Sequence, residues 1–119
     1  MFEQAIKTVK STPLFRERYD NWIGGRWVAP LSGAAFTDHS PINGRAIATF
    51  ASSGPEDVEL ALDAAHGAKA AWARVSPSDR ARMLNRIADR LEDNLEFFAH
   101  AETIDNGKPI RETRDIDIP

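Results

Sequence analysis

The sequence contains no cysteine. Disulfides, thiolate nucleophiles and cysteine-based metal centres are therefore excluded within its 119 residues. It also has no apolar run near the roughly 20 residues that a membrane-spanning helix needs. The opening, MFEQAIKTVK, carries scattered charges and lacks the apolar segment of a signal peptide. These absences predict a cytoplasmic protein.

An excess of positive charge is missing as well. The formal net charge is −3, which gives no electrostatic reason to expect nucleic acid or an anionic membrane as a partner. Because 42% of the residues are hydrophobic, a chain of this length can form one domain with a modest core.

The first half of the chain shows a helix signal followed by strand and turn signals. YDNWIGGRWVAP predicts a β-hairpin, because Gly24 and Gly25 can supply the positive φ angles of a tight turn. SPING then predicts a turn over 41–44, and AIATF predicts a strand. Apolar residues at helical spacing predict a short N-terminal helix, ended by Pro13: Phe2, Ala5, Ile6 and Val9.

Two long amphipathic helices are predicted next. Ser53 and Glu56 have the spacing of a capping box, and Ser76 and Asp79 repeat it. The second helix is predicted to run unbroken over 76–105 and to stop at Asn106-Gly107. The first helix has a mostly alanine stripe: Val58, Ala61, Leu62, Ala65, Ala68 and Trp72. The second has a longer stripe: Leu84, Ile87, Ala88, Leu91, Leu95 and Phe98.

The second predicted helix also carries apolar residues away from its stripe. They are Met83, Phe97, Ala101 and Ile104. A helix in a lone small domain usually buries one face, so a second apolar face predicts a second packing partner. A few exposed apolar residues are normal on any surface, but Phe97 and Ile104 are large and close together. The pattern favours a neighbour that this chain does not supply.

No catalytic constellation stands out. Neither G-x-S-x-G nor S-x-x-K occurs, so a hydrolase triad has no anchor. IGGRW lacks the glycine spacing of a phosphate-binding loop. The histidines lie too far apart in sequence for a metal motif: His39, His66 and His100.

Arginines recur every four residues at 82, 86 and 90. Such a stripe could bind phosphate, but Asp89 and Asp93 share the same outer face. Alternating charges are typical of a solvated, ion-paired surface. We therefore expect no nucleic-acid partner and no membrane partner.

The order of the segments resembles the N-terminal region of the NAD(P)-dependent aldehyde dehydrogenase family, and most of all bacterial enzymes for acetaldehyde and other short aldehydes. The resemblance runs from about Tyr19 to Pro119. Its most specific part is L-x-x-I-A-D-x-L-E followed by E-T-x-D-N-G-K-P. The segments that carry it are NWIGGRWV, SPINGRAIATF, EDVELALDAAHGAKAAWA and SDRARMLNRIADRLEDNLEFFAHAETIDNGKPIRET.

The resemblance implies a parent enzyme that oxidises aldehydes to carboxylic acids with NAD or NADP. In this family the polypeptide continues into a dinucleotide-binding sheet, a catalytic domain and an oligomerisation hairpin, so a homo-oligomer is expected. The nucleophile of the family is a cysteine, which this chain lacks. The general-base glutamate and the glycine-rich cofactor segment belong to later regions. The resemblance therefore implies no catalytic and no nicotinamide-binding residue here.

One family site could lie within the chain. Many members hold a structural monovalent cation, K⁺ or Na⁺, with main-chain carbonyls before the turn and with the aspartate of DNGKP. The matching positions are Asp38, His39 and Asp105. Oxygen ligands suit a hard cation. The alternative is that Asp105 caps its helix end or meets solvent.

The expected fold is an α+β fragment of the α/β aldehyde dehydrogenase fold, with an N-terminal β-hairpin and strand followed by two long amphipathic helices. We expect a lead-in over 1–18, a hairpin and strand segment over 19–52, and a truncated helical segment of the coenzyme-binding domain over 53–119. The ending, HAETIDNGKPIRETRDIDIP, predicts a truncation, with the remainder of the enzyme as partner. The alternative is a freestanding interaction module that uses the face of Met83, Phe97 and Ile104.

Overall fold

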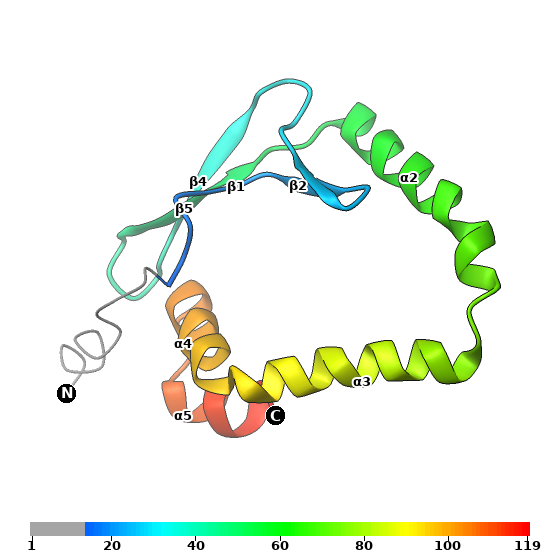
Figure 1. The fold of residues 1–119 in the computed structure, drawn as a ribbon. Coiled ribbons are helices and arrows are strands. Elements are labelled where there is room, and N and C mark those ends of the chain that lie inside the picture. Colours follow the sequence, from blue (N-terminus) through cyan, green and yellow to red (C-terminus); the bar gives the residue numbers. More distant parts are fainter. Residues whose placement is uncertain (1–13) are drawn as a thin grey trace.

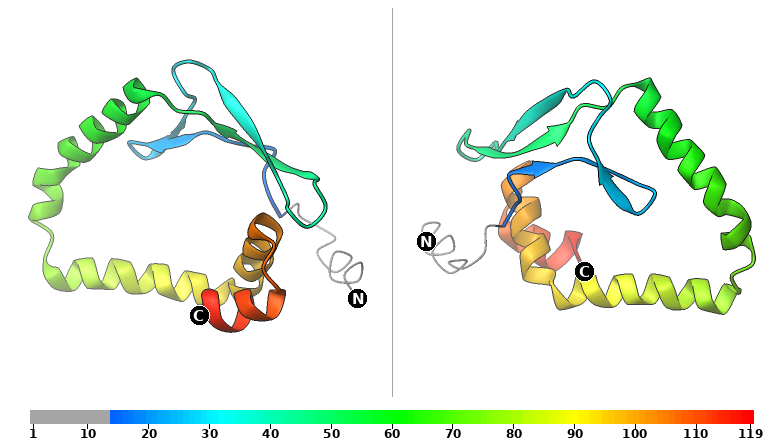
Figure 2. Two further views of the ribbon diagram at one scale, coloured as in Figure 1. Left: turned by 180° about the vertical axis from the view of Figure 1, so that it is seen from behind. Right: turned by 45° about the horizontal axis from the view of Figure 1, so that its top comes forward.

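A computed structural model describes residues 14–119, which form two small sheets and a chain of helices arranged as an open frame (Figure 1, Figure 2). The predicted helix with Phe2 and Val9 lies outside the described residues. The strands are β1 Arg18–Tyr19, β2 Asn21–Ile23, β3 Arg26–Val28, β4 Ala35–His39 and β5 Ala46–Ala51. The helices are α2 Pro55–Ala73, α3 Pro77–Asp93, α4 Leu95–Asn106, α5 Ile110–Glu112 and the π-helical segment η1 Thr113–Asp117.

The predicted hairpin is present as the antiparallel pair β2–β3. Gly24 and Gly25 form its turn with φ angles of 60° and 79°, which residues other than glycine rarely adopt. Trp22 and Trp27 lie opposite each other in the pair, with ring centroids 5.1 Å apart in an edge-to-face arrangement. The turn prediction is therefore confirmed at both glycines.

The second sheet has the order β1-β5-β4. AIATF forms β5 as predicted, antiparallel to β4 and parallel to β1. Phe36 and Phe50 are opposite each other across β4 and β5, with stacked rings 5.8 Å apart. The sequence does not predict β4, because the mostly exposed residues AFTDH show no alternation of apolar and polar side chains.

The start of α2 differs from its prediction by one residue. Its N-cap is Gly54, whose backbone N–H donates to Asp57 Oδ2 at 2.9 Å. Ser53 Oγ instead donates to Asn21 Oδ1 at 2.8 Å. Proline is favoured at the first helical position, so Pro55 fixes the cap at the preceding residue.

The start of α3 agrees with its prediction. Ser76 is the N-cap, and its Oγ accepts a hydrogen bond from the backbone N–H of Asp79 at 3.1 Å. The same hydroxyl donates to Asp79 Oδ2 at 2.6 Å. The side chain of Asp79 therefore completes the cap from within the first turn.

The prediction of one helix over 76–105 is wrong, because Asn94 separates α3 from α4. Its backbone has φ −119° and ψ 24°, and its side-chain amide donates to the carbonyl of Arg90 at 2.8 Å. Asparagine side chains compete with the backbone in this way and disfavour helix interiors. Met83 and Phe97 consequently lie on different helices, so the second apolar face is not continuous. The predicted stop is confirmed, since Gly107 has φ 81°.

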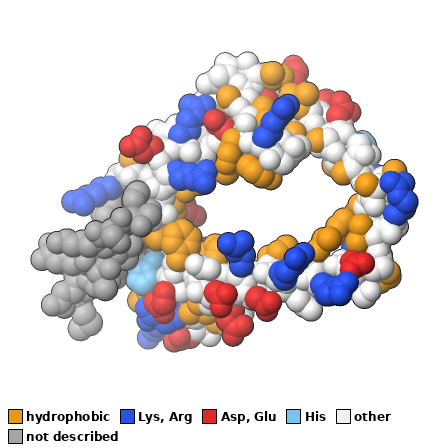
Figure 3. All heavy atoms as spheres, in the orientation of Figure 1, with side chains coloured by type: hydrophobic (Ala, Val, Ile, Leu, Met, Phe, Trp, Pro, Cys, Tyr) orange, Lys and Arg blue, Asp and Glu red, His pale blue; other side chains and the backbone are white. Residues whose placement is uncertain are grey.

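Residues 14–119 leave the apolar stripes of α2 and α3 uncovered. Trp72, Leu84 and Ile87 are 49%, 66% and 57% exposed. Ala48 and Ala99 are the buried apolar residues of the described part. Apolar side chains instead gather along the inner side of the frame, around an opening that remains visible in a space-filling view (Figure 3). The radius of gyration, 17.7 Å, exceeds the roughly 13.5 Å of a compact chain of this length.

The C-terminal elements pack through a buried hydroxyl pair. Thr113 is fully buried, its Oγ1 donates to the carbonyl of Ile110 at 3.1 Å, and it lies 2.8 Å from Thr103 Oγ1. Two ion pairs also hold η1, Lys108 with Asp117 and Arg114 with Glu96. Because the Thr113 hydroxyl donates its hydrogen to the Ile110 carbonyl, its oxygen accepts the hydrogen bond from the Thr103 hydroxyl.

We expect Thr113→Val to lower the free energy of unfolding by about 1–2 kcal/mol, because it leaves the buried hydroxyl of Thr103 without an acceptor. Urea unfolding followed by circular dichroism measures the change. The double variant Thr103→Val with Thr113→Val should cost less than the sum of the single variants, since both polar partners are gone. Additive costs would contradict the hydroxyl pair.

Candidate functional site

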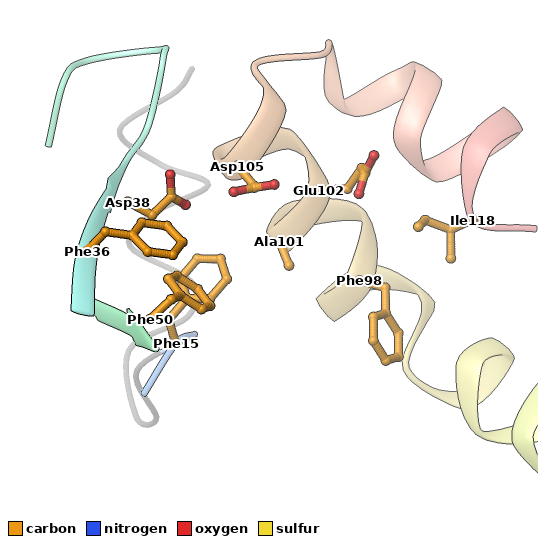
Figure 4. Close-up of a pocket in the computed structure, with 9 residues that line it drawn as sticks. All are labelled: Phe15, Phe36, Asp38, Phe50, Phe98, Ala101, Glu102, Asp105 and Ile118. Carbon is orange, nitrogen blue, oxygen red and sulfur yellow. The ribbon is translucent and has the colours of Figure 1, made fainter. Parts of the chain in front are cut away.

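An open hollow of about 430 Å³ lies between the β4–β5 sheet and α4 (Figure 4). We call it the sheet–α4 hollow. Phenylalanine rings form much of its wall, and three carboxylates lie beside them. Its lining residues are Phe15, Phe36, Asp38, Phe50, Phe98, Ala101, Glu102, Asp105 and Ile118.

Contacts between two turns bring the carboxylates together. Ser40 Oγ, after the end of β4, donates to the carbonyl of Ile104 at 2.6 Å. Pro41 lies against Gly107, where an added Cβ would be 3.1 Å from Pro41 Cγ. These contacts join the end of β4 to the end of α4, so that the side chains of Asp38 and Asp105 point toward one another (Figure 4).

The structure therefore places two of the three predicted cation-site residues together. Asp38 and Asp105 both line the hollow, whereas the imidazole of His39 does not. The backbone N–H of His39 donates to Asp38 Oδ1 at 2.9 Å. Residues 14–119 contain no cluster of three or more histidine, cysteine, aspartate or glutamate side chains that could hold a metal ion. A cation here would need main-chain oxygens in addition to carboxylates.

The hollow has an excess of negative charge. Hydrogen bonding to Asp38 raises the pKa of Asp105, and burial and the charges of Asp38 and Glu102 act in the same direction. Glu102 accepts a hydrogen bond from Asn106 Nδ2 at 2.6 Å. Within the described range, no basic side chain forms an ion pair with any of the three carboxylates.

Sequence reasoning missed Glu102 and the phenylalanine wall. A signal was available, because Phe98, Glu102 and Asp105 follow one another at i, i+4 and i+7 and share one face of α4. The unbroken helix predicted over 76–105 assigned Phe98 to a long core stripe instead. The role of Phe36 and Phe50 depended on β4, which was not predicted.

The arginines that recur every four residues in the sequence lie on α3. Arg82 pairs with Asp79 on the exposed surface of α3. None of the helices in the described range has the length and apolarity required to cross a membrane.

Comparison with known proteins shows matches across nearly the whole chain. The family model "Aldehyde dehydrogenase family" matches residues 27–119. An aldehyde dehydrogenase of Paracoccus denitrificans is 59% identical over 88% of this chain and 21% of its own length. An aldehyde dehydrogenase of Rhodospirillum rubrum is 54% identical over 100% of this chain and 24% of its own. An acetaldehyde dehydrogenase of Pseudomonas aeruginosa is 53% identical over the same shares.

Solved structures agree in fold. An indole-3-acetaldehyde dehydrogenase in complex with NAD⁺ is 34% identical, with a TM-score of 0.85 over 99% of this chain and 23% of that one. This chain thus spans about a fifth to a quarter of the length of the curated relatives that it matches. The expected α+β piece of a larger α/β fold is confirmed. With its sequence matched from residue 27 to residue 119, the chain belongs to the aldehyde dehydrogenase family.

Proposed function

We propose that this chain is the N-terminal structural part of an enzyme that oxidises aldehydes to carboxylic acids with NAD⁺ or NADP⁺. The observation that carries the proposal is the exposure of both long apolar stripes in a family member that spans about a fifth of its relatives. In the complete enzyme, the remainder of the polypeptide would cover α2 and α3. A homo-oligomer and a cytoplasmic location stay predictions for that enzyme.

The accessible surface supports this packing role. It measures 9251 Å², whereas a compact monomer of the same mass has about 6,400 Å². Even if residues 1–13 were wholly exposed, they would account for about 2,000 Å². An excess on the order of 1,000 Å² therefore belongs to residues 14–119, and a standard protein interface buries about 800 Å² on each side.

We assign no catalytic and no nicotinamide-binding role to residues of this chain. Aldehyde oxidation by covalent catalysis needs a thiolate to form the thiohemiacetal, and the chain has no cysteine. The alternative of a freestanding interaction module relied on one face carrying Met83, Phe97 and Ile104. The break at Asn94 argues against it, because that face is divided between two helices.

The proposal predicts no NADH formation by the 119-residue chain with acetaldehyde. A chimera in which the chain replaces the matching segment of the Pseudomonas aeruginosa acetaldehyde dehydrogenase should oxidise acetaldehyde within about tenfold of that relative's rate. The increase in NADH absorbance measures the rate of the chain alone and the rate of the chimera. A matched chimera with Leu84→Glu and Ile87→Glu should lose activity, because it buries charges in the covered stripe. Turnover by the chain alone would contradict the proposal. So would a chimera without the glutamate substitutions that folds but is inactive.

We further propose that Asp38 and Asp105 help to hold a monovalent cation, K⁺ or Na⁺, with main-chain oxygens at Asp38 and His39. The support is their convergence in the hollow and the raised pKa of Asp105. A cation between two carboxylates would relieve their repulsion and supply structural stability without taking part in the chemistry.

Asp105→Asn tests the charge balance of this site. At pH 7 in a buffer free of K⁺ and Na⁺, the variant should be more stable than the native chain by up to about 1 kcal/mol, because it removes like-charge repulsion and a negative charge from a helix C-terminus. The pKa of Asp105 is raised in the folded state, so its favourable protonated form is lost as pH rises through that pKa. The advantage of the variant should therefore vanish as pH falls below about 4.

Thermal unfolding in KCl and in choline chloride of equal ionic strength separates the cation from general screening. KCl should raise the melting temperature of the native chain and not that of Asp105→Asn. Equal responses of both proteins to both salts would rule out a specific cation.

A further inference from the structure

We propose that the sheet–α4 hollow is a docking groove for a polypeptide segment that presents a lysine or arginine between large apolar side chains. The inference rests on the function proposed above, because the segment would come from the part of an aldehyde dehydrogenase that this chain does not span.

The apolar surface of the groove comes from its phenylalanine rings. Phe36 stacks on Phe50 and is still 55% exposed, and Phe98 and Ile118 line the hollow from the helical side. Burial of apolar surface contributes about 25 cal/mol per Å². A segment with leucine-sized or larger side chains would therefore gain most by lying against these rings.

The negative charge of the groove comes from three carboxylates that form no ion pair within residues 14–119. Nearby acids on α4 and η1 already have basic partners, Glu96 with Arg114 and Asp117 with Lys108. Within residues 14–119 the hydrogen-bond partners of Asp38, Glu102 and Asp105 are uncharged donors or each other, and none of the three forms an ion pair with a basic side chain. A wholly apolar segment would desolvate these charges without compensation, and an acidic one would be repelled.

A basic side chain between apolar ones suits both the carboxylates and the phenylalanine rings. Where the cation proposed above is not bound, an ammonium or guanidinium group can pair with the carboxylates in its place, and the faces of phenyl rings attract cations as well. The raised pKa of Asp105 agrees with negative charge that lacks a counter-charge. The curated relatives extend well beyond the fifth to a quarter of their length that this chain covers, which leaves ample polypeptide to supply the segment.

Binding of labelled peptides to the 119-residue chain tests the inference. The probe is a fluorescein-labelled heptapeptide that alternates leucine and lysine. One matched peptide has glutamate in place of lysine, and another has serine in place of leucine. Fluorescence anisotropy is measured in a tetramethylammonium buffer free of K⁺ and Na⁺. The leucine–lysine peptide should bind at least about tenfold more tightly than either matched peptide.

Three variants locate the binding. Asp38→Asn combined with Glu102→Gln should weaken binding of the leucine–lysine peptide by about fivefold to tenfold. Phe36→Ala should weaken it by about fivefold. Asp89→Asn, on the exposed face of α3, removes one negative charge away from the hollow and should change the affinity by less than about twofold. Circular dichroism confirms that each variant retains its helices.

The inference is wrong if the glutamate peptide or the serine peptide binds as tightly as the leucine–lysine peptide. It is also wrong if Asp89→Asn loses as much affinity as the double variant. If the chimera is active and any of these results is found, the docking groove is refuted and the proposed function stands. Selective binding together with a folded but inactive chimera retains the groove and removes the enzymatic role.

Discussion

Asp57→Ala is expected to lower the free energy of unfolding by about 3 kcal/mol. Asp57 is only 3% exposed. Its Oδ1 accepts from the backbone N–H of Leu31 and its Oδ2 from that of Gly54, each at 2.9 Å. Alanine would leave both donors unpaired and remove a negative charge from the N-terminus of α2, where the helix dipole favours one.

The loss would separate α2 from the loop that follows β3. The Asp57 carboxylate joins the start of the helix to Leu31 across 26 residues of sequence, so it fixes where α2 leaves the sheets. Asp57→Asn keeps one acceptor oxygen and should cost less than alanine. Glu56→Ala, in the same helical turn but exposed, is the matched control and should cost less than about 1 kcal/mol. Equal costs at positions 56 and 57, measured by urea unfolding, would refute the role of Asp57.

Local signals in the sequence predicted the local structure well. Two glycines marked the β2–β3 turn, Ser76 marked the start of α3, and Gly107 marked the end of α4. Each of these depends on the backbone preference of one or two residues. Where two local signals competed, the prediction failed. Pro55 overrode the Ser53 cap, and the side chain of Asn94 broke a helix whose apolar pattern continued through it.

The candidate site could be predicted only in part, because its residues meet through tertiary contacts. The resemblance pointed to Asp38 and Asp105, and the structure brings them together through the Ser40–Ile104 hydrogen bond. No periodic pattern reports a contact between residues so far apart in the chain. The same limit applies to the stripes of α2 and α3. Their spacing predicts a buried face, but it does not say that the covering surface lies outside these residues.

Gly107→Val is expected to lower the free energy of unfolding by about 3–4 kcal/mol. Gly107 has φ 81°, a left-handed conformation that costs a residue with a Cβ about 1–2 kcal/mol and a β-branched residue more. The added Cβ would also lie 3.1 Å from Pro41 Cγ, and overpacking costs about 1–3 kcal/mol. Urea unfolding measures the sum.

Gly44→Val separates these two costs. Gly44 has φ 69°, close to that of Gly107, but nothing lies within 4 Å of its added Cβ. It should therefore show the conformational cost alone, about 2 kcal/mol. The difference between the two variants measures the contact with Pro41, and Pro41→Ala should recover part of it in Gly107→Val.

We expect the same contact to position the carboxylates of the hollow. Because Pro41 and Gly107 join the ends of β4 and α4, displacement at Gly107 should move Asp105 away from Asp38. The response to KCl that we propose for the cation site should then be lost in Gly107→Val and retained in Gly44→Val. Equal stability losses and equal KCl responses in the two glycine variants would show that this junction does not position the carboxylates.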